Sequence, residues 1–425
     1  MCNSIVKSSQ LMSATSSVPV PYFPITDEVH AILAIVRRGC EELLIEDEFV
    51  QKLARSAQTG KPLRVKLGLD PTAPDIHIGH TVVLNKMRQL QDLGHTVIFL
   101  IGDFTSLIGD PSGRNQTRPP LTREQIEVNA KTYLAQAALV LDCKKTEIRY
   151  NSEWLMPLGA DGVIGLASRY TVARMLERED FTKRFQGRVP ISIHEFLYPL
   201  IQGYDSVALQ SDLEVGGTDQ KFNLLMGREL QRQHGQEPQC ILTMPLLEGL
   251  DGVDKMSKSK NNYIGISDKP SEIFGKLMSI SDTLMWRYIK LLSFRSLDEI
   301  TDCQRQVQAG YNPRTLKALF AQEIVARFHS QADARRALED FNLRARGGVP
   351  EYITEIELGG APLPIKQLLK QAGLVPSTSE ALRNVEQYGV KIDGTIIIDK
   401  ELKLESGVYV VQVGKRRFAR VTLRA

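Results

Sequence analysis

Residues 63–80 read LRVKLGLDPTAPDIHIGH, and they indicate the fold class more clearly than any other stretch. The continuous apolar character of Leu63–Leu69 predicts a buried strand. Asp70-Pro71 should end that strand, because proline cannot donate a hydrogen bond to a sheet ladder. His77–Leu93 then predicts a helix that ends before Gly94. A strand, a turn and a helix in this order are typical of an α/β sheet.

The same alternation continues along the following part of the chain. Further buried strands are predicted at Thr96–Gly102 and Cys240–Met244, and further helices at Arg123–Leu141 and Ile193–Leu209. Gly216-Gly217 stands where another helix should open. Strands that alternate with helices imply a parallel sheet, with a ligand crevice at the carboxyl ends of the strands. We therefore expect an α/β fold of the Rossmann type here.

Beyond residue 270 the pattern changes twice. Residues 270–345 have helical periodicity and almost no strand signal, with helices predicted at Ile273–Met278, Leu284–Leu292, Thr315–Arg327 and Gln331–Leu343. Gly359–Pro362 predicts a linker. A helix pair follows it, and short β-type runs come last, at Gly389–Ile392, Thr395–Ile398, Gly407–Val413 and Arg417–Leu423.

The composition is that of an ordinary globular protein. The chain has 425 residues, of which 42% are apolar and 24% charged, so several domains are expected. No apolar run approaches the roughly 20 residues that cross a bilayer. The five cysteines stand singly, which argues against a zinc site and a disulfide framework and favours a reducing compartment.

Positive charge is concentrated near the C-terminus. The net charge is +3, but residues 360–425 alone carry +5, which leaves −2 for the other residues. A basic segment of this kind is expected to meet a polyanion such as RNA. A solvated tail with excess lysine is the alternative that charge alone leaves open.

Two pairs of basic residues recur at spacings that suit phosphate binding. Lys255–Ser259 reads KMSKS and predicts a loop with two lysines three residues apart. His77 and His80 are also three apart, and we expect both imidazoles on one face of the first turn of the predicted helix. Gly79 between them leaves room for a nucleotide, and a helix N-terminus favours phosphate. Either pair alone is more often a set of solvated surface side chains.

The two segments together, in this order, resemble the paired signature of class I aminoacyl-tRNA synthetases. GLDPTA at residues 68–73 is similar, more narrowly, to the bacterial-type tyrosyl-tRNA synthetase family. The resemblance covers roughly residues 35–425. It implies a Rossmann-type catalytic domain at 31–268, an all-helical anticodon-region domain at 269–350 and a small α+β RNA-binding domain at 361–425. Residues 1–30 are expected to be a poorly ordered leader, because the first 26 residues are rich in Ser, Pro and Val and carry a single charge.

A helical stripe supplies the expected amino-acid pocket. Tyr198, Gln202 and Asp205 stand at i, i+4 and i+7, which by itself could be the polar edge of an amphipathic helix. The resemblance implies that Tyr198 and Gln202 hold the tyrosine ammonium, with Asp110 as a second anchor, and that Asp205 accepts a hydrogen bond from the phenol. Gln220 would contact the carboxylate of the amino acid. A buried carboxylate left without that hydroxyl would be unpaired, so phenylalanine should be rejected.

The resemblance also implies the residues that act on ATP. His77 and His80 would serve the α-phosphate, and Lys255 and Lys258 the departing pyrophosphate. The implied ATP contacts are Asp70, Thr72, Gly79, Gly217, Asp219, Leu246, Leu247 and Lys258.

Further candidates lie outside this pocket. Arg114 and Arg118 match positions that reach pyrophosphate from a mobile loop, although exposed loop arginines are usually solvated. The C-terminal part resembles the RNA-binding domain of ribosomal protein S-four, and Lys366, Lys370 and Arg383 are its RNA-contact candidates. A β-rich oligomerisation cap is the alternative reading of that part.

One position departs from the family pattern. Many tyrosyl-tRNA synthetases have a tyrosine four residues before the aspartate of the Asp-Pro-Thr stretch, where it contacts the substrate hydroxyl, but this chain has Lys66. Lys221-Phe222-Asn223 also replaces the aromatic residue and glycine that other members have after Gln220. Both departures suggest a divergent branch.

The implied activity is that of a tyrosine–tRNA ligase. L-tyrosine and ATP give tyrosyl-adenylate and pyrophosphate, and the tyrosyl group passes to the 3′ end of tRNA(Tyr). Mg²⁺ is expected to arrive with ATP, with no tightly bound cofactor and no dedicated metal site. A cytoplasmic homodimer without a membrane segment is expected. The alternatives are a synthetase for another aromatic amino acid and a non-catalytic RNA-binding protein or splicing factor on the same scaffold.

Overall fold

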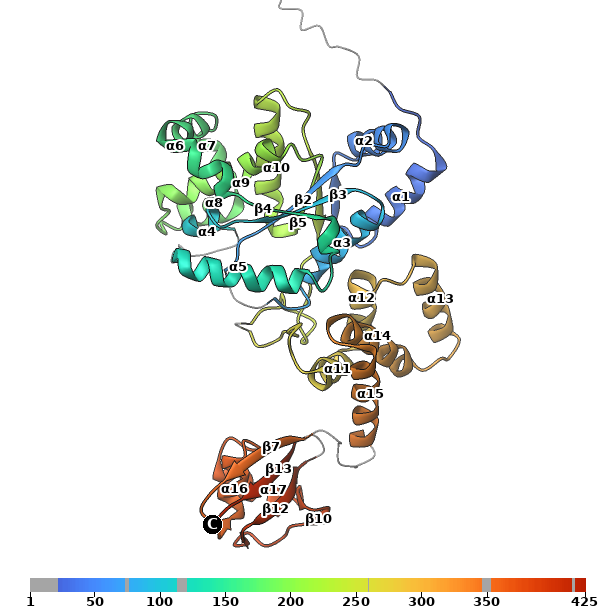
Figure 1. Cartoon of the computed structure of the whole chain (residues 1–425), viewed down its shortest axis with the longest axis vertical. Helices are drawn as coiled ribbons and strands as arrows, with labels where there is room; N and C mark the ends of the chain where they lie inside the picture. Colours follow the sequence, from blue (N-terminus) through green and yellow to red (C-terminus); the bar gives the residue numbers. More distant parts are fainter. Residues whose placement is uncertain (1–21, 73–75, 113–120, 259, 346–352, 415–416) are drawn as a thin grey trace, which may run out of the picture.

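The computed structural model of the chain describes residues 22–72, 76–112, 121–258, 260–345, 353–414 and 417–425 (Figure 1). A six-stranded sheet with the order β1-β6-β5-β2-β3-β4 forms the centre of its larger part. The strands are β1 (Glu42–Leu44), β2 (Arg64–Leu69), β3 (Thr96–Ile101), β4 (Thr146–Tyr150), β5 (Leu213–Gly217) and β6 (Cys240–Met244). All neighbours pair in parallel except β1, which is antiparallel to β6. This confirms the expected Rossmann-type α/β fold.

The strand order creates a crevice beside β2. After β2 the chain continues through β3 to β4 on one side, and then returns to place β5 and β6 on the other side. Parallel sheets bind ligands where the strand order reverses in this way, outside the carboxyl ends of the strands. The turns that follow β2 and β5 therefore face the same crevice.

Helices cover both faces of this sheet (Figure 1). They are α1 (Asp27–Arg37), α2 (Glu46–Thr59), α3 (Thr81–Asp92), α4 (Thr105–Ile108), α5 (Arg123–Ala137), α6 (Ser152–Ala167), α7 (Val172–Met175), α8 (Glu179–Gln186), α9 (Ile193–Leu209) and α10 (Lys221–Gln233). The bounds of α9 and β6 are those predicted. The patterns did not predict α1, α2, α4, α6, α7, α8, β1 or β4, and α1 begins inside the segment expected to be a poorly ordered leader.

The helix expected from His77 begins only at Thr81, so its predicted start was wrong. The backbone N–H of Ile78 donates to the carbonyl of Ile264 at 2.9 Å, and His77 forms a β-bridge with Gly265. These bonds to a distant segment replace the local ones that a helix would need at these residues. Arg123 starts α5 as predicted, but α5 ends at Ala137, before the predicted Leu141.

A helical region follows the sheet. It contains α11 (Pro270–Ser279), α12 (Asp282–Leu292), α13 (Leu297–Gln308), α14 (Pro313–Phe328) and α15 (Gln331–Ala345), of which only α13 was not predicted. Its buried apolar residues form one continuous cluster with those of the sheet. Arg38 donates to the carbonyl of Ser293 at 2.7 Å, and Asn85 of α3 donates to the carbonyl of Leu292 at 3.3 Å. The helical region is thus packed directly against the α/β part.

The C-terminal part has a separate apolar core and a second sheet of order β10-β9-β12-β13-β7. Its elements are β7 (Thr354–Leu358), β8 (Leu363–Pro364), α16 (Ile365–Gln371), α17 (Thr378–Glu386), β9 (Val390–Ile392), β10 (Thr395–Ile396), β11 (Lys403–Leu404), β12 (Gly407–Val413) and β13 (Arg417–Leu423). The predicted start at residue 361 leaves out β7, which pairs in parallel with β13. Gly359–Pro362 therefore connects two strands inside this part and is not a linker between domains.

Within the described residues, no helix is both long enough and apolar enough to span a membrane.

Glycines allow α9 and α10 to pack closely beside the crevice. A Cβ atom on Gly227 of α10 would lie 2.6 Å from Ser206 Oγ and 2.7 Å from Gln239 Nε2. Contacts this short cannot be relieved without moving buried polar groups.

We predict that Gly227→Ala lowers the free energy of unfolding by about 2 kcal/mol, the scale of overpacking in a dense core. Gly275→Ala in α11 is the matched control, because a Cβ there meets nothing within 4 Å and alanine favours a helix. Urea unfolding of both variants measures the difference. Equal stabilities would show that the close approach is not a constraint.

Candidate active site

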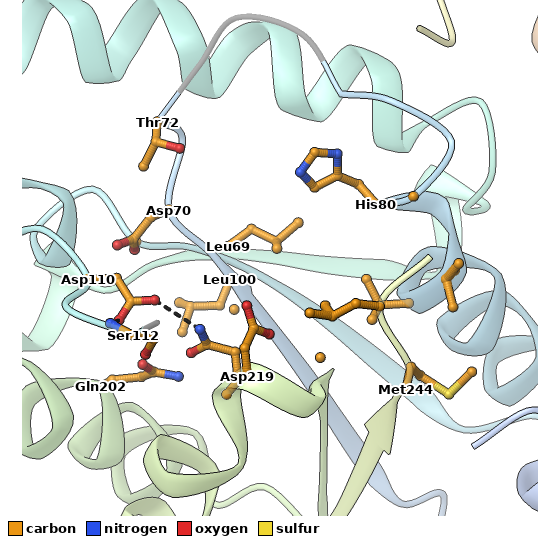
Figure 2. Close-up of a pocket in the computed structure, with 18 of the residues that line it drawn as sticks. Leu69, Asp70, Thr72, His80, Leu100, Asp110, Ser112, Gln202, Asp219 and Met244 are labelled. Carbon is orange, nitrogen blue, oxygen red and sulfur yellow. Dashed lines mark hydrogen bonds between the residues drawn. The ribbon is translucent and has the colours of Figure 1, made fainter. Parts of the chain in front are cut away.

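A cavity of about 650 Å³ opens at the carboxyl ends of β2 and β5. Figure 2 shows Asp110, Ser112 and Gln202 at one end of it and His80 and Met244 at the other, with Asp219 between them. The candidate residues that line it are Asp70, Thr72, His77, Gly79, His80, Asp110, Tyr198, Gln202, Asp205, Gly217, Asp219, Gln220, Leu246, Leu247 and Lys255. Residues chosen from separate parts of the sequence thus lie around one cavity.

Not all candidates lie at this cavity. Lys258 is exposed on the same loop as Lys255 but does not line the cavity. Arg114 and Arg118 lie outside the described residues. Lys366 and Lys370 lie on α16 and Arg383 on α17, all in the C-terminal part.

His77 and His80 lie in the turn before α3, with ring centroids 3.9 Å apart. Nδ1 of His77 accepts from the N–H of Gly79, and Nδ1 of His80 accepts from the N–H of His77, both at 3.2 Å. Each neutral ring therefore carries its proton on Nε2. A Cβ on Gly79 would lie 2.8 Å from His77 Nδ1, so a glycine is needed there to form the turn.

Burial keeps both histidines neutral. It lowers the pKa of His77 to about 2, with further lowering by His80 and by the lysines of the KMSKS loop. Burial and Lys255 lower the pKa of His80 to about 4. At neutral pH the pair can therefore offer two N–H donors without a positive charge.

A negatively charged pocket lies at the end of β2. The phenol of Tyr198 donates to Asp70 Oδ2 at 2.8 Å, and Thr105 donates to Asp70 Oδ1 at 2.7 Å. Burial and the charges of Asp70 and Asp110 raise the pKa of Tyr198 well above its usual value. This environment suits a cation such as an ammonium group.

Two amides flank this pocket. Gln220 Nε2 donates to Asp110 Oδ2 at 2.9 Å. Oε1 of Gln202 is buried at the cavity, with no hydrogen-bond partner among the described residues. An acceptor left open in this way is ready to bind a donor of a ligand.

Asp205 is buried, and its carboxylate accepts from Trp154 Nε1 at 2.8 Å and from Asn151 Nδ2 at 3.3 Å. Burial raises the pKa of Asp205 to about 7, against the opposing effect of Lys66. The sequence patterns did not identify Trp154 or Asn151. Asn151 directly follows β4, and a polar residue at the carboxyl end of a parallel strand could have indicated it; no pattern marks Trp154.

Lys255 and Met256 of the KMSKS segment line the cavity. Lys255 Nζ lies 3.1 Å from Asp219 Oδ2, which joins this loop to the end of β5. Met256 is buried, and its N–H donates to the carbonyl of Leu247 at 2.8 Å. Asn262, also not identified from the sequence, accepts from the N–H of Ser257 at 2.9 Å. The loop is thus held by its own backbone and by one buried amide.

The described residues contain no group of three or more His, Cys, Asp or Glu side chains placed to hold a metal ion.

Comparison with known proteins identifies the family of this chain. Residues 58–344 match the sequence profile described as tRNA synthetases class I (W and Y). The chain belongs to this synthetase family.

Curated relatives of this synthetase are named tyrosine–tRNA ligase. The one from Burkholderia lata is 80% identical over 405 residues, which cover 95% of this chain and 98% of that protein. The one from Burkholderia mallei is 78% identical over 412 residues, covering 97% and 100%.

Solved structures agree on the fold of this synthetase. A C-terminally truncated mitochondrial tyrosyl-tRNA synthetase from Aspergillus nidulans covers 73% of the chain with a TM-score of 0.63 and 20% identity, and 93% of that protein is matched. The tyrosyl-tRNA synthetase of Archaeoglobus fulgidus, solved in complex with L-tyrosine, covers 73% with a TM-score of 0.57 and 26% identity, and 99% of it is matched.

The buried histidine turn makes the stability of this synthetase depend on pH. The pKa of His77 in the folded chain lies below its usual value of 6.5. Below pH 6.5, His77 therefore binds a proton in the unfolded chain but stays neutral in the folded chain. Stability must therefore fall as pH drops from 6.5.

We predict that His77→Asn removes part of this loss, about 1 to 2 kcal/mol between pH 7 and pH 5. Urea unfolding of the wild type and the variant at the two pH values measures it. His194→Asn is the control, because His194 is exposed on α9. If the wild type and His77→Asn lose the same stability on acidification, His77 is not held neutral by burial.

Proposed function

We propose that this synthetase is a tyrosine–tRNA ligase. It activates L-tyrosine with ATP, releases pyrophosphate and transfers the tyrosyl group to the 3′ end of tRNA(Tyr), as a step of protein synthesis. The assignment rests on the positions of three kinds of polar site in one cavity. A buried carboxylate, Asp205, suits a phenol, the pocket of Asp70 and Asp110 suits an ammonium, and the histidine turn and KMSKS loop suit phosphate.

The amino acid is bound by groups whose hydrogen bonds are already arranged. Its ammonium would lie among Asp110, Tyr198 and Gln202, where the negative field and the open acceptor of Gln202 favour it. Its hydroxyl would donate to Asp205. Gln220, held by Asp110, would contact its carboxylate. Fixed side chains of this kind lower the entropic cost of orienting the substrate.

ATP would occupy the other part of the cavity. Asp219 suits the ribose hydroxyls, Leu246 and Leu247 the adenine, and Asp70, Thr72, Gly79 and Gly217 would complete the contacts. A Cβ on Gly217 would lie 2.5 Å from Asp219 Oδ1, so glycine keeps that carboxylate in place. Lys255 forms an ion pair with Asp219. Binding of the ATP ribose to Asp219 would break this ion pair, and Lys255 could then contact the ATP phosphates.

The chemical step is one displacement at phosphorus. A carboxylate oxygen of tyrosine forms a bond to the α-phosphorus of ATP, and the bond from that phosphorus to the bridging oxygen of pyrophosphate breaks. His77 and His80 would donate from Nε2 to α-phosphate oxygens, and Lys255 and Lys258 would stabilise the departing charge. Arg114 and Arg118 would assist at the pyrophosphate, as the family resemblance implies. Mg²⁺ would enter as part of the ATP complex.

Amino-acid-dependent exchange of pyrophosphate into ATP, without tRNA, tests the function. We predict exchange with tyrosine and none above background with phenylalanine or tryptophan. Exchange with another amino acid would contradict the pocket assignment. No exchange with any of them would favour the RNA-binding alternative.

We predict that Lys258→Ala slows adenylate formation about a hundredfold while tyrosine affinity is unchanged, because the lysine acts on charge that develops in the transition state. Pre-steady-state adenylate formation and equilibrium tyrosine binding separate the two effects. Lys260→Ala is the matched control, since Lys260 lies on the same loop and pairs with Asp254 at 2.7 Å. Equal losses of rate and affinity would contradict the role of Lys258.

The C-terminal part supplies a tRNA contact. Lys370 and Arg383 are exposed on α16 and α17, and Lys366 is half-buried on α16. These cations would meet RNA backbone phosphates with a salt-dependent affinity. The helical region between the two sheets would face the anticodon region.

The active protein would be a homodimer in the cytoplasm, where protein synthesis takes place. Large apolar side chains are exposed on α6 to α9, namely Met156, Ile164, Val172, Phe185 and Ile193, with Ile193 77% exposed. Several exposed apolar side chains on neighbouring elements mark a surface that another subunit can cover.

We predict that Phe185→Asp with Ile193→Asp converts a dimer into a monomer in sedimentation velocity. Leu319→Asp is the control, because Leu319 is an exposed apolar residue of α14, far along the chain from this surface. A wild type that sediments as a monomer would contradict the proposal.

A further inference from the structure

A lysine with no exposed surface lies in the central strand of the sheet. Lys66 of β2 is 0% exposed and lines the cavity. Its Nζ lies 2.9 Å from a carboxylate oxygen of Glu214 on β5 and donates to Ser206 Oγ at 2.8 Å. Burying two charges is costly and often adds no net stability compared with apolar residues of similar volume. A role beyond folding is therefore the better explanation.

The partner carboxylate is fully engaged. The other oxygen of Glu214 accepts from Ser206 Oγ at 3.0 Å and from Gln239 Nε2 at 2.5 Å. Gln239 is itself completely buried, and its N–H donates to Gln231 at 2.7 Å. This network fixes the position of the Lys66 ammonium.

The network lies next to the carboxylate that would read the phenol. Ser206 follows Asp205 on α9, and Asp205 lines the same cavity as Lys66. Burial raises the pKa of Asp205 and Glu214 raises it further, while Lys66, Trp154 and Asn151 lower it. The other acidic groups at the cavity, Asp70, Asp110 and Asp219, add negative charge. Lys66 is the one fully buried cation among the described lining residues.

We propose that Lys66 is a positioning residue for tyrosine recognition. Its ammonium, fixed by Glu214 and Ser206, favours the ionised form of the Asp205 carboxylate, which accepts a hydrogen bond from the substrate phenol. Where many members of the family place a tyrosine that touches the hydroxyl, this chain places a charge that acts through Asp205. This inference rests on the proposed function.

The arrangement has a consequence for selectivity. An ionised, buried Asp205 without a hydroxyl partner is costly, so phenylalanine is excluded. A protonated Asp205 carries no charge, so the penalty for phenylalanine is smaller. Lys66 therefore governs both the pH range of tyrosine binding and the discrimination against phenylalanine.

Two variants shift the charge around Asp205 in opposite directions. Glu214→Gln removes a negative charge and leaves Lys66, so tyrosine binding should persist to lower pH than in the wild type. Lys66→Met combined with Glu214→Gln also removes the ammonium, so binding should require higher pH. The double variant leaves no unpaired buried charge, which protects the fold.

Trp154 provides the readout, because it donates to Asp205 and the chain has only 2 tryptophans. In a Trp286→Phe background, tyrosine titrations followed by fluorescence from about pH 5.5 to about pH 8.5 bracket the region where Asp205 titrates. Thermal unfolding checks that each variant is folded. We expect the pH midpoint of tyrosine binding to be lower for Glu214→Gln than for the double variant. At pH 7 the double variant should bind tyrosine about tenfold more weakly than Glu214→Gln.

The outcomes separate the two claims. If the wild type binds tyrosine and neither variant shifts the pH midpoint of binding, Lys66 is only structural. The same conclusion follows if both variants shift that midpoint in the same direction. A wild type that neither binds tyrosine nor exchanges pyrophosphate would overturn the proposed function and this inference with it.

Discussion

The parallel pairing of β2 with β3 on one side and β5 on the other is the constraint on which the site depends. Leu69 lies opposite Ile101, and Lys66 lies opposite Glu214, in registers that a shift of one residue would invert. Because all three strands end at the same edge, their following turns face one crevice. Asp70 and Gly217, far apart in the sequence, thereby line the same cavity.

The cavity concentrates negative charge in a largely buried place, and the surrounding polar groups offset the cost. Asp70 accepts from Tyr198 and Thr105, and Asp205 accepts from Trp154 and Asn151. Hydrogen bonds of this kind replace water around a buried carboxylate. They also fix each carboxylate before a substrate arrives, which is what selective binding of an ammonium and a phenol requires.

Sequence patterns predicted the elements whose stability is local. The bounds of α9, β6, β12 and β13 are those predicted, and a capping box of Ser192 and Glu195 begins α9. The patterns failed where distant contacts decide. His77 forms a β-bridge with Gly265 and is not part of the helix that follows it. β7 is stabilised by its parallel pairing with β13. The candidate residues were recovered through the family resemblance, but Trp154 and Asn151 were not, since only the fold brings them to Asp205.

A crystal structure with a non-hydrolysable analogue of tyrosyl-adenylate bound would locate each part of the substrate in the cavity. We predict that the phenol lies at Asp205, the ammonium among Asp110, Tyr198 and Gln202, and the ribose at Asp219 with Lys255 displaced from it. An analogue bound in the opposite orientation, or with its phenol away from Asp205, would contradict the account.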